Sequence, residues 1–275
     1  MSNFLKRSLT AFAFVVIMLI GTLIHPYAFI IVFGAILFFT LKEFYVLTEH
    51  AGFQPQKLHG QILSIFYFLI CFLTANNLIP KNLVLLFMPF LLFILIGEIF
   101  RKRDNSLRNG TVTIFGLIYI TLPFSLLNFI VLSGPPSNKF FYPWILLGVF
   151  FIIWVYDSAA YISGSLFGKH KIAEKISPGK SWEGFTGGTV FAIITGIINS
   201  VLFQDISMFN WIIIALLTVV FGTLGDFFES KIKRELDIKD SGKILPGHGG
   251  LLDRFDSLLF AIPGIFVWLS FMDKF

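Results

Sequence analysis

Apolar residues along the chain form runs of about 20 residues separated by shorter polar stretches, the pattern of helices that cross a membrane. Nine such spans are predicted, with approximate limits 9–24, 27–46, 61–79, 83–100, 111–132, 144–164, 184–203, 208–225 and 255–272. No polar domain interrupts them. The pattern therefore predicts an all-α, polytopic helical bundle forming one integral membrane domain, residues 1–275. Within it we expect N-terminal spans over 1–135 and catalytic spans with their loops over 140–275.

Composition agrees with this prediction, and charge adds an orientation. The chain is 56% hydrophobic with a mean hydropathy of +0.83, well above the usage of soluble domains. Of its 21 Lys and Arg residues, 18 fall at the N-terminus and in alternate connections, and 3 fall on the opposite side. By the positive-inside rule the N-terminus is cytoplasmic and the C-terminus lies outside. The first span follows basic residues, but no cleavage site follows it, so we expect an uncleaved helix.

The two longest cytoplasmic connections contain polar residues that membrane topology alone does not require. The shorter basic connections are explained by orientation and by attraction to anionic headgroups. The connection after span eight instead mixes acids, bases and glycines: GDFFESKIKRELDIKDSGKILPGHGGLLDRFD, residues 225–256. If span eight continues as a helix, Asp226, Glu229, Ser230 and Lys233 share one face. The other possibility is a solvated loop that only satisfies the topology.

Carboxylates at the ends of two helices could hold a divalent cation. Asp253 and Asp256 are three residues apart at the start of span nine, facing the same surface as Asp226. Carboxylates without a His/Cys cluster favour Mg²⁺, and the single cysteine excludes a cysteine metal site. The turn at 247–250 offers backbone amides to an anion, although its histidine could simply hydrogen-bond to the backbone. Basic side chains are available for phosphate oxygens: Lys231, Lys233, Arg234, Lys239, Lys243 and Arg254.

Two further features precede this region. Asp157 lies near the cytoplasmic end of span six, where a carboxylate needs a partner, a cavity or a metal. It could bond to Tyr161 or Ser158, and the small residues around it also permit close helix packing. The segment SPGKSWEG, residues 177–184, could be a turn with Ser181 as the N-cap of span seven, or could bring Lys180 to a phosphate.

Residues 230–256 resemble the signature of the phosphatidate cytidylyltransferases, also called CDP-diacylglycerol synthases. The pattern S-x-x-K-R-x4-K-D-x-G-x2-L-P-G-H-G-G-x-x-D-R-x-D is met without a gap. The segments 157–169 and 177–184 resemble family blocks in the expected order, and the first five spans match only in hydrophobicity. The resemblance implies an integral membrane homodimer with a lipid-accessible cavity. It implies an enzyme that converts CTP and phosphatidate to CDP-diacylglycerol and pyrophosphate with Mg²⁺.

The resemblance also assigns roles to residues. The metal ligands would be Asp226 and Asp253, and the catalytic group would be completed by Lys233, Arg254 and Asp256. The remaining candidates would lie in or around the CTP and phosphate site: Asp157, Ser177, Lys180, Ser230, Arg234, Lys239, Asp240, His248, Gly249 and Gly250. The expected location is a bacterial inner membrane with the site facing the cytoplasm.

Three other functions fit parts of the pattern. A CTP-dependent lipid kinase of the polyprenol type would share the nucleotide-binding end but move the γ-phosphate. A transporter would use Asp157 and the basic loops as an ion path, which predicts charges spread through several spans. A membrane scaffold would not need two helix ends bearing carboxylates. The uninterrupted signature favours the cytidylyltransferase.

Overall fold

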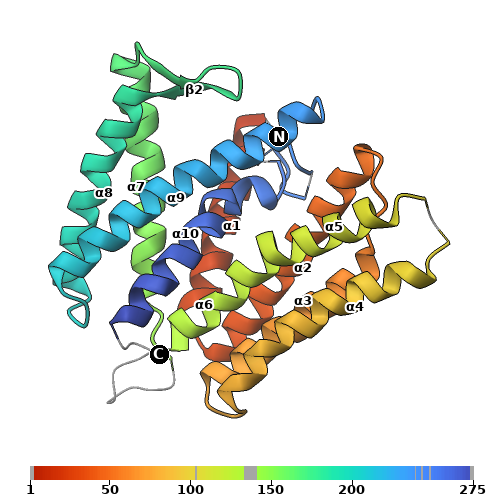
Figure 1. Ribbon diagram of the computed structural model, residues 1–275. Coiled ribbons are helices and arrows are strands. Elements are labelled where there is room, and N and C mark those ends of the chain that lie inside the picture. Colours follow the sequence, from red (N-terminus) through yellow and green to blue (C-terminus); the bar gives the residue numbers. More distant parts are fainter. Residues whose placement is uncertain are drawn as a thin grey trace.

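The computed structural model describes residues 3–102, 104–132, 141–238, 240–242, 244–247 and 249–272, with side chains from residue 8 onward. The elements are arranged as shown in Figure 1. In chain order they are α1 (Asn3–Leu23), α2 (Pro26–His50), α3 (Lys57–Ala75), the 3₁₀ helix η1 (Lys81–Leu86), α4 (Phe87–Phe100), α5 (Ser106–Gly116), the π-helix η2 (Leu117–Thr121), α6 (Leu122–Leu132), α7 (Trp144–Phe167), β1 (Lys171–Ala173), β2 (Ser177–Ser181), α8 (Trp182–Leu202), α9 (Met208–Glu235) and α10 (Leu252–Phe271).

These elements confirm the all-α membrane prediction. Within the described residues, eight helical segments are long and apolar enough to cross a membrane, and α1 contributes a shorter apolar helix, Ser8–Leu23. Two predicted spans are composite: η1 continues into α4, and α5, η2 and α6 form one rod. The eighth span differs most from prediction. α9 runs on to Glu235 and α10 begins at Leu252, so the helical alternative for the residues after span eight is confirmed, and Asp253 and Asp256 lie at the start of the last helix.

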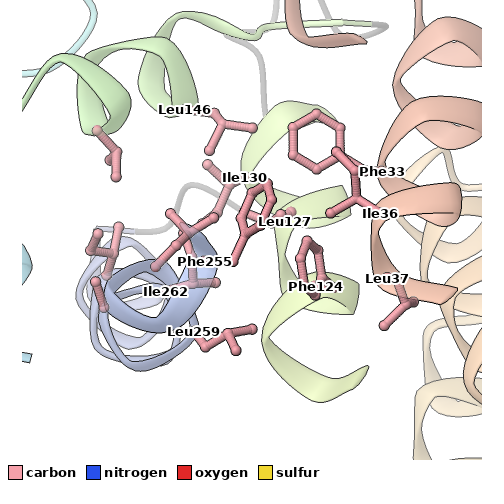
Figure 2. Close-up of a cluster of buried hydrophobic side chains, with 14 of the residues drawn as sticks. Phe33, Ile36, Leu37, Phe124, Leu127, Ile130, Leu146, Phe255, Leu259 and Ile262 are labelled. Carbon is pink, nitrogen blue, oxygen red and sulfur yellow. The ribbon is translucent and has the colours of Figure 1, made fainter. Parts of the chain in front are cut away.

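The core joins the two parts of the chain through α6. Phe33 and Leu37 of α2 face α6 from one side, and Phe255 and Ile262 of α10 face it from the other (Figure 2). The rings of Phe124 and Phe255 lie with centroids 5.3 Å apart. Fully buried aromatic side chains of this kind lock the relative positions of helices distant in sequence. As a result α10 packs against α6 and α2 as well as against α9.

Small residues set the packing of α7 against α8. A Cβ added at Gly184 would lie 2.8 Å from the Ala160 carbonyl oxygen, and one at Gly188 would lie 2.8 Å from the Tyr156 ring. Lipid-embedded helices associate through such close contact, because the hydrophobic effect does not drive them together inside the bilayer. Ala160, one of the small residues near Asp157, lies at both contacts, so close helix packing, one of the two interpretations of this segment, is confirmed there.

The connection between α7 and α8 forms an antiparallel hairpin of β1 and β2 instead of an irregular loop. In Figure 1 this hairpin lies at the same end of the bundle as the C-terminal end of α9. The Arg234 Nε donates to the Ile176 carbonyl oxygen at 3.4 Å, joining the two. Ser181 is the N-cap of α8, and its hydroxyl accepts from the Gly184 amide, as predicted for the turn.

Candidate functional site

Four carboxylates from three helices line one cavity of about 390 Å³, called here the polar cavity. Asp157 comes from α7, Asp226 from α9, and Asp253 and Asp256 from the first turns of α10. The other lining residues are Thr10, Ala11, Phe14 and Val15 of α1, Ile153 and Trp154 of α7, and Leu245, Arg254 and Ser257. The lining residues from α9 and α10 are thus mostly charged, and those from α1 and α7 are mostly apolar, with Asp157 as the charged exception.

A second cavity of about 360 Å³, the hairpin cavity, adjoins the first. Its lining residues are Tyr156, Asp157, Ala160, Tyr161, Ile172, Gly179, Lys180, Ser181, Gly184, Phe185, Thr223 and Asp226. Asp157 and Asp226 belong to both cavities. The Ser158 hydroxyl donates to the Trp154 carbonyl oxygen at 2.7 Å rather than to Asp157. The Asp157 carboxylate therefore lies between two cavities that together could accept two substrates.

The predicted polar face of α9 is confirmed. The Ser230 hydroxyl donates to the Asp226 carboxylate at 3.1 Å, and the Lys233 ammonium lies 2.5 Å from the Glu229 carboxylate. These contacts join residues four positions apart, the spacing that stacks side chains along one helix face. Glu229 is 1% exposed, so α9 carries charge into the protein as well as along the cavity.

Asp253 is the most extensively bonded of the four carboxylates. It accepts from the Lys233 ammonium at 2.8 Å, the Ser241 amide at 3.0 Å and the Gly250 amide at 2.7 Å. Gly249 has a φ of +82°, and a Cβ there would lie 2.7 Å from the Asp253 carboxylate. The loop can wrap around this carboxylate because glycine adopts a positive φ at little cost and leaves the approach open.

Lys180 reaches the site from β2. Its ammonium lies 2.6 Å from the Asp226 carboxylate and 4.7 Å from the centre of the Phe227 ring. The hairpin holds this position, since β2 pairs with β1 at Lys171 and Ser181 and then leads directly into the capped start of α8. A cation therefore stands at the boundary between the two cavities, where phosphate oxygens would meet it.

The structure does not bring every predicted residue to the cavities. Arg234 faces the hairpin, and Ser177, Asp240, Gly249 and Gly250 are absent from the described cavity linings, although Gly250 holds Asp253. Lys233, predicted as a catalytic residue, is absent from both linings as well and reaches the site only through Asp253. Ser230 touches the site through Asp226. Lys239 and His248 lie outside the described residues, and so does Lys243.

Some residues that contribute to the site were missed. Phe14 and Val15 of α1 line the polar cavity, but the sequence could not reveal this. An apolar residue that lines a cavity cannot be distinguished by its type from one that faces lipid. Glu43 is buried on α2, and its carboxylate accepts from the Leu252 amide at 3.0 Å. An acidic residue inside an apolar span is rare and usually functional, and that signal could have identified Glu43.

The donor set suits a hard divalent cation that shares its coordination with substrate. Within the described part of the chain, no three His, Cys, Asp or Glu side chains converge into a ready-made metal site. Mg²⁺ is commonly bound by one or two carboxylates together with substrate phosphates and water. Asp226 and Asp253 line one cavity, and each already faces an ammonium group, so both positions favour positive charge.

Comparison with known proteins gives a consistent picture. The model of the Cytidylyltransferase family matches residues 5–272. A phosphatidate cytidylyltransferase of Haemophilus influenzae is 48% identical over 124 residues, which is 43% of either chain. One of Staphylococcus saprophyticus is 37% identical over 191 residues, 69% of this chain and 68% of the relative. One of Staphylococcus epidermidis is 36% identical over 236 residues, 74% of this chain and 88% of the relative.

Proposed function

Since this chain belongs to the cytidylyltransferase family, we propose that it transfers the cytidylyl group of CTP to phosphatidate, giving CDP-diacylglycerol and pyrophosphate. The observation that carries the proposal is the polar cavity, whose lining combines four carboxylates and Arg254 with apolar side chains of α1 and α7. A lipid phosphate and a water-soluble nucleotide can meet in such a cavity, because its apolar residues suit the lipid and its charged residues suit the nucleotide.

The chemistry is a displacement at phosphorus. An oxygen of the phosphatidate phosphate forms a bond to the α-phosphorus of CTP, and the bond from that phosphorus to the bridging oxygen of pyrophosphate breaks. The electron pair of the broken bond leaves with pyrophosphate. Phosphate monoesters lose their second proton near pH 6, so at neutral pH the nucleophile carries its charge without a dedicated base. Positioning and charge stabilisation are then the main tasks of the protein.

Basic side chains would supply that stabilisation. Lys180 stands at the boundary of the two cavities, and Arg254 lines the polar cavity beside Asp253. Lys233 is held between the carboxylates of Glu229 and Asp253, which fixes its ammonium group in place. We propose that Lys180 and Arg254 bind the phosphates directly and that Lys233 orients Asp253. Asp256 would supply a further negative group on the same wall.

The cofactor in this proposal is Mg²⁺, held by Asp226 and Asp253. When bound it neutralises charge on the phosphate oxygens, the ordinary contribution of this ion to phosphoryl and nucleotidyl transfer. The ammonium groups of Lys180 and Lys233 contact these two carboxylates, which both line the polar cavity. Asp157, which both cavities share, would then face the substrates from α7.

The proposal includes a location and an assembly. The charge asymmetry of the connections supports a cytoplasmic N-terminus and an external C-terminus, with the active site on the cytoplasmic face of a bacterial inner membrane. Labelling of single cysteines placed at each end would test the orientation. The family resemblance supports a homodimer, which crosslinking in native membranes would test.

The experiment that tests the function uses purified protein in detergent with phosphatidate, Mg²⁺ and CTP labelled at either the α- or the γ-phosphorus. We expect α-label to enter the organic phase as CDP-diacylglycerol, with γ-label released as pyrophosphate. Transfer of γ-label to the lipid would make the protein a lipid kinase and would overturn the proposal. Label in neither product, from folded protein, would also reject it.

A further inference from the structure

Glu43 is a buried carboxylate that comes from a part of the chain with no recognisable motif. It lies on α2 with 6% exposure, and Leu41 and Phe44, near it in the sequence, are also buried. Its Oε2 accepts from the amide of Leu252, a residue 209 positions away, at 3.0 Å. A charged group is costly in such a place, so its position calls for an explanation in terms of what it holds.

The group that Glu43 holds is the N-terminus of α10. Leu252 is the first residue of that helix, and the N-cap residue, Leu251, supplies no side-chain cap. The first amides of a helix lack partners within the helix, and a negative charge there is favourable. Glu43 therefore acts as an N-cap that α2 supplies to α10. The amide that it binds belongs to Leu252, the residue just before Asp253.

The same carboxylate packs against the loop that leads into α10. A Cβ added at Gly250 would lie 2.6 Å from the Glu43 Oε2. At Gly242 the three nearest atoms to an added Cβ all belong to Glu43, and the closest is Oε1. Within the described residues this Oε1 has no hydrogen-bond partner. The two glycines thus allow the loop to lie directly on the Glu43 side chain.

Asp253 contacts the other side of this loop. The amide of Ser241, the residue before Gly242, and the amide of Gly250 itself both donate to the Asp253 carboxylate. The loop is consequently clamped between two carboxylates, Glu43 behind it and Asp253 on the cavity side. We propose that Glu43 is a positioning residue that, by capping α10 and supporting this loop, sets the position of Asp253 in the polar cavity.

The first test compares two buried carboxylates in the first six helices. Glu43→Ala removes the cap, whereas Glu98→Ala removes a carboxylate of equal exposure, 6%, that contacts Gln56 and Arg101. We expect amide hydrogen exchange in peptides covering 241–255 to accelerate about ten- to hundredfold in Glu43→Ala only, with a matching fall in kcat. Unchanged exchange in Glu43→Ala, or equal acceleration in both variants, would overturn the proposal.

Glu43→Gln provides a milder variant that keeps an oxygen for the Leu252 amide. We expect its exchange rate and kcat to lie between those of the wild type and Glu43→Ala. If Glu43→Ala cannot be purified as a folded protein, hydrogen exchange is measured on Glu43→Gln instead. A Gln variant that exchanges as slowly as wild type and yet loses as much activity as Ala would reject the positioning role.

The second test uses the contact with Gly242. Gly242→Ala alone forces a methyl group into Glu43, so we expect reduced activity and faster exchange of the loop. In the Glu43→Ala background that clash is gone, and the double variant should be no worse than Glu43→Ala. Losses that simply add would overturn the proposal. Only the activity readout rests on the proposed cytidylyl transfer; hydrogen exchange is measured without substrates, so failures of the two proposals are distinguishable.

Discussion

Both parts of the molecule bury carboxylates beside basic groups, but they use them differently. In the first six helices, the Glu98 carboxylate accepts from Gln56 at 2.7 Å and from Arg101 at 2.6 Å, and these partners tie α3, α4 and the turn after α4 together. In the last four helices, Asp226 and Asp253 have similar partners but line a cavity. The difference is that the carboxylates Asp226 and Asp253 themselves line a cavity, whereas Glu98 does not line the cavity that its partner Arg101 borders.

The comparison also shows where the two parts meet. Glu43 belongs by sequence to the first six helices, yet its carboxylate serves the loop that shapes the site. The α1 residues Phe14 and Val15 likewise form a wall of the polar cavity. The N-terminal helices thus complete the site sterically and through one hydrogen-bonding carboxylate, while the chemistry-bearing groups come from α7 to α10 and the hairpin.

The largest effect is expected at the carboxylates of the polar cavity. Asp226→Asn or Asp253→Asn keeps the shape but removes the charge, and activity should fall about a thousandfold or more, as expected when a group that stabilises transferring phosphates is lost. Glu98→Gln, the matched change in the first six helices, should leave the activity of folded protein within about twofold. The assay is label transfer from CTP to lipid, with membrane insertion checked by extraction. An active Asp253→Asn enzyme would reject the metal assignment.

A smaller loss is expected when Lys180 is replaced. Lys180→Met keeps much of the side-chain volume but leaves Asp226 without its ammonium partner and the cavity boundary without a cation. We expect kcat/KM for CTP to fall about a hundredfold. Lys57→Met, which breaks an exposed ion pair with Glu49, is the control and should change little. Equal activity of both variants would contradict the proposed role of Lys180 in binding phosphate.

Substitutions that disturb helix packing near the site should lower the stability of the protein more than its activity. Gly188→Ala brings a methyl group to 2.8 Å from the Tyr156 ring and 2.9 Å from the Ala160 Cβ, and overpacking of this kind costs about 1–3 kcal/mol. Gly34→Ala on α2 meets only Phe68, at an ordinary 3.6 Å, and should be tolerated. Thermal unfolding in detergent measures both. A Gly188→Ala protein as stable as Gly34→Ala would contradict the close packing of α7 and α8.

The smallest effect is expected at the cap of α8. Ser181→Ala removes the acceptor for the Gly184 amide and should cost about 1 kcal/mol of stability. Because Ser181 also lines the hairpin cavity next to Lys180, a modest rise in KM for CTP should accompany the loss. Ser181→Thr retains the hydroxyl, so we expect it to recover the stability. Failure of the threonine variant to do so would argue against the capping role.

The sequence by itself determined the features that depend on local spacing. Runs of apolar residues are enough to define membrane helices, because a helix in lipid must satisfy its own backbone and needs only length and hydrophobicity. The spacing of Asp226, Ser230 and Lys233 was enough to align them, since a helix repeats every 3.6 residues. The signature itself pointed to Asp253 and to the chemistry.

Only the tertiary structure decided which distant residues meet. The contact of Lys180 with Asp226 depends on a hairpin that the sequence suggested only as a turn, and the contact of Glu43 with Leu252 joins residues 209 positions apart. Arg234, although it belongs to the signature, faces the hairpin carbonyl of Ile176 and not the cavity. Such pairings depend on how helices pack and cross, which follows from the fit of side chains across whole interfaces and leaves no local pattern in the chain.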